Sequence, residues 1–226
     1  MKTVYLVRHA TAVDKGDKLP DFERSLTAGG EKEAKFMARH VPRRKGTPAL
    51  MVSSFANRAI ETAHIFAKAM GYPARKILLK DTFYGDVKPE ILVDEIRHLP
   101  DKCSSVMLFG HDPAFSALAA HFVKGFKEII PKCGVAGIEF PSSSWAALRA
   151  GQGRLVFFSS PAQLKEEKKR LRGDLEARLV DGLEKILGDV SRPAAAAVKK
   201  NLRRAVQKLV KEFLKNLPAG PPLAGS

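Results

Sequence analysis

The chain is poor in cysteine and in long hydrophobic runs, and each scarcity argues against a class of protein. Its two cysteines, Cys103 and Cys133, have no CxxC or other metal-ligand spacing. We expect reduced thiols, although one disulfide remains open. No apolar run approaches the roughly 18 residues of a membrane helix, and the start, Met1-Lys2-Thr3, has no signal-peptide pattern. The sequence therefore predicts a cytoplasmic protein with no membrane span.

Acidic residues are also scarce. The chain has 24 Asp and Glu against 39 Lys and Arg, a net charge of +15. Residues 161–226 hold 15 basic and 8 acidic residues, so this short part is more basic per residue than the rest. Positive charge favours anionic partners such as phosphorylated proteins, polyanions or an anionic membrane surface. A merely solubilising surface explains the C-terminal charge equally well, and we do not expect nucleic acid to be the partner.

Residues 1–160 alternate between strand-like and helical patterns, which predicts an α/β fold. We expect a mainly parallel central sheet with helices on both faces. Further short apolar runs predict antiparallel strands at one edge of the sheet. The expected strands are 3–8, 49–53, 76–80 and 105–110, the helices 28–41, 56–70, 88–98 and 113–123, and the edge strands 135–140, 145–148 and 154–158.

After Pro161 the pattern becomes that of two basic amphipathic helices. We expect Gly188 to end the first and Ser191-Arg192-Pro193 to form the turn before the second. The predicted domains are thus 1–160, a helical extension over 161–217, and a disordered tail over 218–226. The apolar stripes of this hairpin must bury against each other, the body, or a second copy in a homodimer.

Four candidate functional residues lie where expected strands end or helices begin. Arg8 and His9 follow the apolar run Val4-Tyr5-Leu6-Val7, Arg58 lies in the first turn of a helix, and His111 follows Gly110. Open α/β sheets bind ligands at the carboxyl ends of their strands. Although a single histidine or arginine has simpler explanations, four such groups at three junctions predict one site for a phosphoryl group.

These residue types suit phosphoryl transfer. A neutral imidazole at His9 could attack phosphorus and carry the phosphoryl group covalently. The guanidinium groups of Arg8 and Arg58 match phosphate oxygens, and His111 could stabilise the transferring oxygens. Because these cations could neutralise the phosphate, and because His64, Glu61 and Asp86 are not spaced like a ligand cluster, we predict a site without metal or cofactor.

Three motifs together resemble the histidine phosphatase superfamily, also called phosphoglycerate mutase-like, over about residues 1–160. They are Leu6-Val7-Arg8-His9-Ala10, Ser54-x-x-x-Arg58-Ala59-x-x-Thr62-Ala63 and Gly110-His111. The stretch Asp21-Phe22-Glu23-Arg24-Ser25-Leu26-Thr27-x-x-Gly30 is similar to the SixA-type phosphohistidine phosphatase branch. The resemblance implies that His9 is the phosphorylated nucleophile and that Arg8, Arg58 and His111 form the phosphate pocket.

The chain departs from the family pattern at two places. Ala10 stands where the superfamily usually has glycine, which is tolerable unless a positive φ is required. The segment 81–86 lies where most members carry an acidic proton donor, and Asp86 is our candidate for it, with a turn or helix cap as the alternative. A weak or absent acid would suit phosphoramidates better than alkyl phosphates.

We therefore predict a phosphatase that acts through a phosphohistidine intermediate, with phosphohistidine on a protein as the leading substrate. One alternative is a phosphatase of small phosphorylated molecules or polyphosphate. Another is a binding module that holds phosphate with little turnover.

Overall fold

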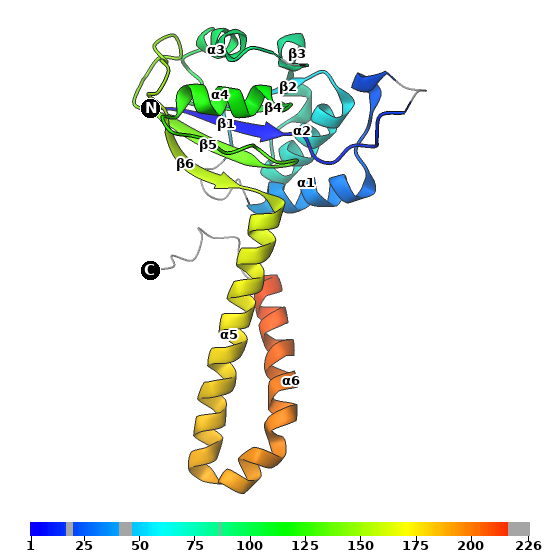
Figure 1. The fold of residues 1–226 in the computed structure, drawn as a ribbon, viewed down its shortest axis with the longest axis vertical. Coiled ribbons are helices and arrows are strands. Elements are labelled where there is room, and N and C mark those ends of the chain that lie inside the picture. Colours follow the sequence, from blue (N-terminus) through cyan, green and yellow to red (C-terminus); the bar gives the residue numbers. More distant parts are fainter. Residues whose placement is uncertain (17–19, 41–46, 86, 217–226) are drawn as a thin grey trace. The chain divides into compact units, whose positions relative to one another are not determined.

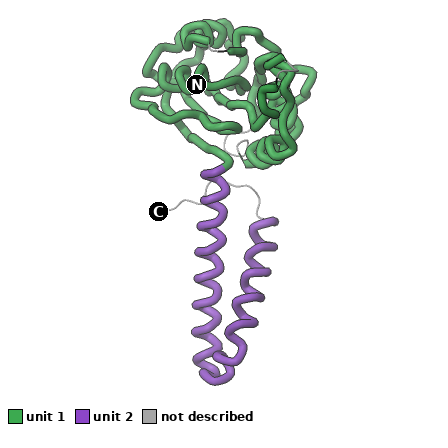
Figure 2. The backbone as a smooth tube through the Cα atoms, turned by 45° about the vertical axis from the view of Figure 1, so that its right-hand side comes forward, with its two compact units in different colours: residues 1–161 green, residues 162–226 purple. Residues whose placement is uncertain are grey.

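The structure, a computed structural model, describes residues 1–226 except 17–19, 41–46, 86 and 217–226. It divides into two compact units, Met1–Pro161 and Ala162–Ser226, which Figure 2 distinguishes by colour.

The first unit is built on a six-stranded sheet with the order β3-β2-β4-β1-β5-β6. β1 pairs in parallel with β4, which pairs in parallel with β2, and β2 with β3; β5 and β6 run antiparallel at the other edge. The predicted α/β fold with an antiparallel edge is confirmed (Figure 1). The strands are β1 (Lys2–Arg8), β2 (Leu50–Ser54), β3 (Leu78–Lys80), β4 (Ser105–Gly110), β5 (Val135–Phe140) and β6 (Arg154–Ser159).

Helices pack on the sheet in two pairs. α1 (Ala28–His40) packs with α2 (Asn57–Met70), and α3 (Pro89–Arg97) packs with α4 (Ala114–Phe122). Alternate residues of a strand point to opposite faces. Val4 and Leu6 accordingly belong to the core beneath α3 and α4, whereas Phe109, on the opposite face, meets the ring of Phe66 from α2. Because both faces are covered, the central strands consist of nearly continuous apolar runs.

The bounds of α2 follow from local sequence. Its C-cap is Gly71, at φ 68°, a left-handed conformation that glycine adopts without strain. The N–H of Tyr72 then donates to the carbonyl of Ala67. The predicted end of this helix at residue 70 is confirmed.

Two strand predictions were wrong in part. Residues 145–148 form turns, not a strand. Trp145 is buried, but its backbone N–H donates to the carboxylate of Asp101 (2.7 Å) and its indole N–H to the carbonyl of Cys103 (2.9 Å). The apolar run therefore reflects burial without ladder pairing. The predicted strand 76–80 is shortened to β3, because Ala74–Lys76 is a 3-10 turn. Two more such turns, Asp21–Glu23 and Asp81–Phe83, lie near the candidate site.

Both cysteines are free, as expected, with Cys133 buried and Cys103 half-buried. None of the helices in the described parts of the chain is both long enough and apolar enough to cross a membrane.

The second unit is a hairpin of two helices, α5 (Pro161–Val190) and α6 (Arg192–Asn216). Gly188 does not end the first helix as predicted, since α5 continues to Val190 and only Ser191 interrupts the two. A glycine within a helix costs only about 1 kcal/mol, and Pro193 fits the first turn of α6, where its missing N–H is not needed. The predicted tail, 218–226, lies outside the described residues.

Candidate active site

The carboxyl ends of three neighbouring strands meet at one edge of the sheet. Arg8 at the end of β1 is in register with Gly110 at the end of β4, and the N–H of His9 donates to the carbonyl of Gly110 (3.0 Å). The ring centroids of His9 and His111 are 5.1 Å apart. A Cβ on Gly110 would lie 2.6 Å from the ring of Phe115, so only glycine fits the position that leads into His111.

His9 is held as a neutral imidazole with one nitrogen free. The residue is 9% exposed, and Nδ1 lies 2.7 Å from the carbonyl oxygen of Ala10. Because a carbonyl only accepts hydrogen bonds, Nδ1 carries the proton and the lone pair stands on Nε2. Burial, with the cations of Arg58 and Arg8 nearby, lowers the pKa of His9 to about 4. At neutral pH the side chain is therefore an uncharged imidazole.

A short hydrogen-bond chain ties the His9 loop to α2. The N–H of Ala10 donates to Oγ1 of Thr62 (3.1 Å), and the hydroxyl of Thr62 donates to the carbonyl of Arg58 (2.7 Å). The only non-glycine residue with positive φ among those described is Cys133. Ala10 therefore has an ordinary backbone conformation, and its methyl group is tolerated as expected.

Arg58 is buried in the first turn of α2, with 5% of the residue exposed. Its Nη1 donates to the backbone carbonyl of Asp21 (2.6 Å) and its Nη2 to the Asp21 carboxylate (2.8 Å). Its Nε is buried without a hydrogen-bond partner among the described residues. Asp21 thus holds both terminal nitrogens of this guanidinium, and the Nε–H of Arg58 remains an unsatisfied donor.

Arg8 is less enclosed than Arg58, since 23% of its side chain is exposed. Its Nη1 donates to the carbonyl of Ile130 (2.9 Å) and lies 3.9 Å from the carboxylate of Asp112. Its Nε, like that of Arg58, is buried with no partner in the described part of the chain. Buried unsatisfied N–H donors are costly, and two on guanidinium groups beside His9 suit an oxyanion.

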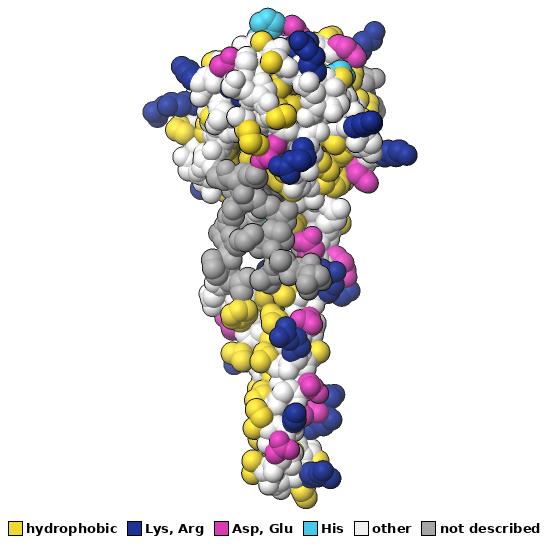
Figure 3. Space-filling model, turned by 90° about the vertical axis from the view of Figure 1, so that its left-hand side faces the viewer, with side chains coloured by type: hydrophobic (Ala, Val, Ile, Leu, Met, Phe, Trp, Pro, Cys, Tyr) yellow, Lys and Arg dark blue, Asp and Glu magenta, His cyan; other side chains and the backbone are white. Residues whose placement is uncertain are grey.

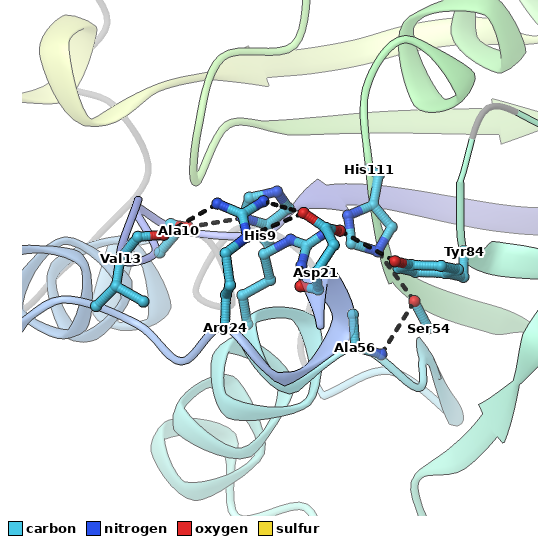
Figure 4. Close-up of polar contacts among 10 residues, drawn as sticks. His9, Ala10, Val13, Asp21, Arg24, Ser54, Ala56, Tyr84 and His111 are labelled. Atoms are coloured by element: carbon cyan, nitrogen blue, oxygen red, sulfur yellow. Dashed lines mark hydrogen bonds and ion pairs between the residues drawn. The ribbon is translucent and has the colours of Figure 1, made fainter. Parts of the chain in front are cut away.

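Sequence reasoning missed three residues that complete the cluster: Asp21, Arg24 and Tyr84. The Asp21 carboxylate accepts hydrogen bonds from Arg58, from Nε of Arg24 (2.9 Å) and from the hydroxyl of Tyr84 (3.0 Å) (Figure 4). Partial burial acts to raise the pKa of Asp21, but the bonds from Arg58, Tyr84 and Arg24 outweigh it and lower the pKa to about 2. Asp21 and Arg24 lie within the quoted motif of 21–30, which was the available signal; Tyr84 had none.

His111 contacts Ser54, the last residue of β2. Its Nε2 lies 2.9 Å from Oγ of Ser54, which also accepts a hydrogen bond from the N–H of Ala56 (3.3 Å). Burial, with His9 and Arg58 adding their effects, lowers the pKa of His111 to about 3. The Ser54 hydroxyl can donate to Nε2 of the neutral ring, which places the ring proton on Nδ1, available as a donor.

The candidate acid, Asp86, lies outside the described residues. Within the described ranges no cluster of three or more His, Cys, Asp or Glu side chains is arranged to hold a metal ion. The side chains that meet at this edge include three arginines, two neutral imidazoles, one phenol and the carboxylates of Asp21 and Asp112.

Comparison with known proteins agrees with this geometry. The family model of the histidine phosphatase superfamily (branch 1) matches residues 4–102. This part of the chain is therefore similar to the histidine phosphatase superfamily, and the similarity extends to a SixA-type protein.

Two solved structures share the fold of the first unit. A putative phosphohistidine phosphatase SixA from Agrobacterium tumefaciens is 28% identical, with a TM-score of 0.58 over 71% of this chain and 98% of that one. The protein histidine phosphatase SixA complexed with tungstate shares the fold at 20% identity, with a TM-score of 0.62 over 72% and 99%. An uncharacterized protein of Mycobacterium tuberculosis (strain CDC 1551 / Oshkosh), MT1313, is 29% identical over 69% of this chain and 99% of its own length.

Proposed function

We propose that this chain is a phosphatase that hydrolyses phosphohistidine on a protein through a covalent phosphoryl-His9 intermediate. The observation that carries the proposal is the state of His9. Its proton is fixed on Nδ1 by the Ala10 carbonyl, and its pKa is lowered to about 4. A free lone pair on Nε2 is what nucleophilic attack on phosphorus requires.

In the first step, Nε2 of His9 attacks phosphorus and the bond from phosphorus to the substrate nitrogen breaks. The electron pair of that bond stays on the leaving nitrogen. In the second step, a water oxygen attacks the phosphoryl group on His9, inorganic phosphate leaves, and the Nε2 lone pair is restored. The cations of Arg8, Arg58 and Arg24 balance charge on the transferring oxygens, so the reaction needs no divalent metal.

The phosphohistidine substrate is supported by the chemistry of Asp21 and Tyr84. With a pKa of about 2, Asp21 is ionised at neutral pH and has no proton to donate. Burial and the hydrogen bond to Asp21 raise the pKa of Tyr84, so its phenol holds its proton tightly. Neither group is matched to protonate an alkoxide, whereas an imidazole already protonated on its other nitrogen leaves as a neutral ring.

The first experiment asks whether the chain turns over at all. Steady hydrolysis of p-nitrophenyl phosphate without added metal is expected, and its complete absence would favour the binding-module alternative. Rapid quenching at neutral pH should then trap a phosphoenzyme that is labile to acid and stable to base. His9→Ala should abolish the label, whereas His64→Ala, an exposed histidine of α2, should keep it.

The second experiment separates the substrate classes. A phosphohistidine protein, phosphoramidate and a set of alkyl and sugar phosphates should be compared by kcat/KM on the same preparation. We expect the two nitrogen-linked substrates to exceed the alkyl phosphates by at least tenfold. Equal or better hydrolysis of the alkyl phosphates would contradict phosphohistidine and support the small-molecule alternative, with Asp86 then examined as the missing acid.

A further inference from the structure

The helical hairpin buries only one ridge of each helix. Three residues of α6 are fully enclosed, Val206, Val210 and Leu214, and they pack against partly buried residues that are nearly all on α5. Two helices that pack only on each other can bury one side of each helix, so apolar residues outside that contact face the solvent. A partner molecule is needed to cover these residues.

Six large apolar side chains of the hairpin remain exposed. On α5 the exposed fractions are 38% at Leu179, 61% at Ile186 and 83% at Val190. On α6 they are 42% at Val198, 60% at Leu209 and 54% at Phe213. Figure 3 shows hydrophobic side chains gathered along one side of the hairpin. We call these six residues the apolar face.

The six residues lie on the same side because of their positions in the helical repeat. Leu179 comes directly before the contact residue Val180, and Leu209 directly before Val210. Exposed and contact residues also alternate at spacings of three and four positions, as Leu175 and Leu179 do on α5 and Val206 and Leu209 on α6. Residues at that spacing are neighbours on one side of a helix, so the exposed residues of each helix adjoin its contact ridge, on the side of the hairpin that Figure 3 shows.

Charge is distributed unevenly between the two helices. α5 has seven basic and seven acidic residues, whereas α6 has eight basic residues and a single acidic one, Glu212. The exposed cations Lys200, Arg204, Lys208 and Lys211 form no ion pair with any described residue. At about 100° per residue they lie on the side of α6 turned away from the apolar face. An anionic membrane or polyanion would be drawn to that basic side and would leave the apolar face uncovered.

We propose that the apolar face pairs with the same face of a second copy of this chain, forming a four-helix bundle. The 25 residues of α6 span about 37 Å, and two packed helices are about 20 Å wide. The face is therefore on the order of 750 Å² per copy, close to the roughly 800 Å² per partner of a standard stable interface. The unpaired lysines and arginines of both copies then point outward, where their repulsion is weakest.

The charges also set the orientation within the bundle. If α6 of one copy lay over α6 of the other, two strongly basic helices would be neighbours. Placing α6 over α5 of the second copy puts each basic helix against one of balanced charge. A two-fold axis parallel to the helices produces this arrangement and keeps neighbouring helices antiparallel.

The test uses the full chain and its mass in solution. Sedimentation of the wild type at about 10–100 µM should give twice the chain mass of 24.7 kDa. The double variant Leu209→Gln and Phe213→Gln should be monomeric with unchanged helix content by circular dichroism. The matched control, Lys208→Gln with Lys211→Gln on the basic side, should remain a dimer.

Several results would overturn the proposal. A monomeric wild type at 100 µM would do so, and if that monomer bound vesicles containing phosphatidylserine, the face would be a lipid surface instead. A double Gln variant that stays dimeric would place the interface elsewhere. For orientation, oxidised mixtures of Ile186→Cys and Val198→Cys chains should form the mixed disulfide, because these exposed positions lie at nearly equal distances from the turn at Ser191; predominant Val198→Cys homodimers would refute the pairing of α6 with α5.

Discussion

The sharpest test of the candidate site is Asp21→Asn, which removes one negative charge and keeps the shape of the side chain. Asp21 holds both terminal nitrogens of Arg58, one through its carboxylate and one through its carbonyl. The same carboxylate binds Arg24 and Tyr84. The substitution leaves the carbonyl contact in place but replaces the carboxylate by an amide, one end of which must face a donor.

The expected size of the effect follows from those contacts. Hydrogen bonds to charged groups contribute about 1.5–3 kcal/mol each, and Asp21 is only 30% exposed in its side chain. If misalignment of Arg58 costs about 1.4–2.8 kcal/mol in the transition state, kcat falls about 10- to 100-fold. The affinity for tungstate, an oxyanion that is not hydrolysed, should change in the opposite direction. With one negative charge fewer beside it, tungstate should bind the variant at least as tightly as the wild type.

The assay is steady-state hydrolysis of p-nitrophenyl phosphate together with calorimetric titration of tungstate. Glu23→Gln is the matched control, because it changes an exposed carboxylate in the same 3-10 turn. A kcat for Asp21→Asn within twofold of the wild type would refute the assignment of Asp21 as a positioning residue for Arg58. A parallel loss of kcat and tungstate affinity in a folded variant would show that Asp21 shapes the whole pocket and does not align one guanidinium.

Three further predictions concern the same cluster. Arg58→Ala should lose on the order of 2–4 kcal/mol of transition-state stabilisation, measured as kcat/KM, and retained activity would contradict its contact with the phosphoryl group. NMR of the imidazole nitrogens should find His9 still neutral at pH 5.5, because burial and the nearby arginines lower its pKa to about 4. A protonated ring at that pH would refute this lowering of the pKa. The unfolded chain binds protons at His9 and His111 below about pH 6.5, whereas the folded chain does so only near 4 and 3. The free energy of unfolding should therefore decrease as the pH falls from 7 to 5, and urea denaturation at the two values tests this, with equal midpoints as the contrary result.

Much of the fold was accessible from sequence because its signals are local. The parallel strands β1, β2 and β4 are apolar runs that end at polar residues, and the carboxyl ends of such strands must meet. This placed His9, Arg58 and His111 at one edge without knowledge of the register. The N-terminal strand and the three other parallel strands therefore follow from pattern and elementary sheet geometry.

Other features depend on contacts between distant segments, which no local pattern records. Asp21 and Tyr84 meet across 63 positions of sequence, and their segments show neither a helical nor a strand period. The apolar run that begins at Trp145 has the composition of a strand. The backbone N–H of Trp145, however, donates to the carboxylate of Asp101 and not to a neighbouring strand. Gly188 has the composition of a helix end, but the packing of the hairpin carries α5 past it to Val190.

The position of β1 between β4 and β5 has a consequence for how the chain is made. Thr3 pairs with Ser105 and Glu139, so the strand of this sheet that is made first has partners that emerge about a hundred positions later. At about 5–20 residues per second, its apolar run stays unpaired for roughly 5–20 s. During that interval the strand that leads into His9 is open to aggregation or to a chaperone. Arrested nascent chains should therefore become protease-resistant only after β4 has emerged.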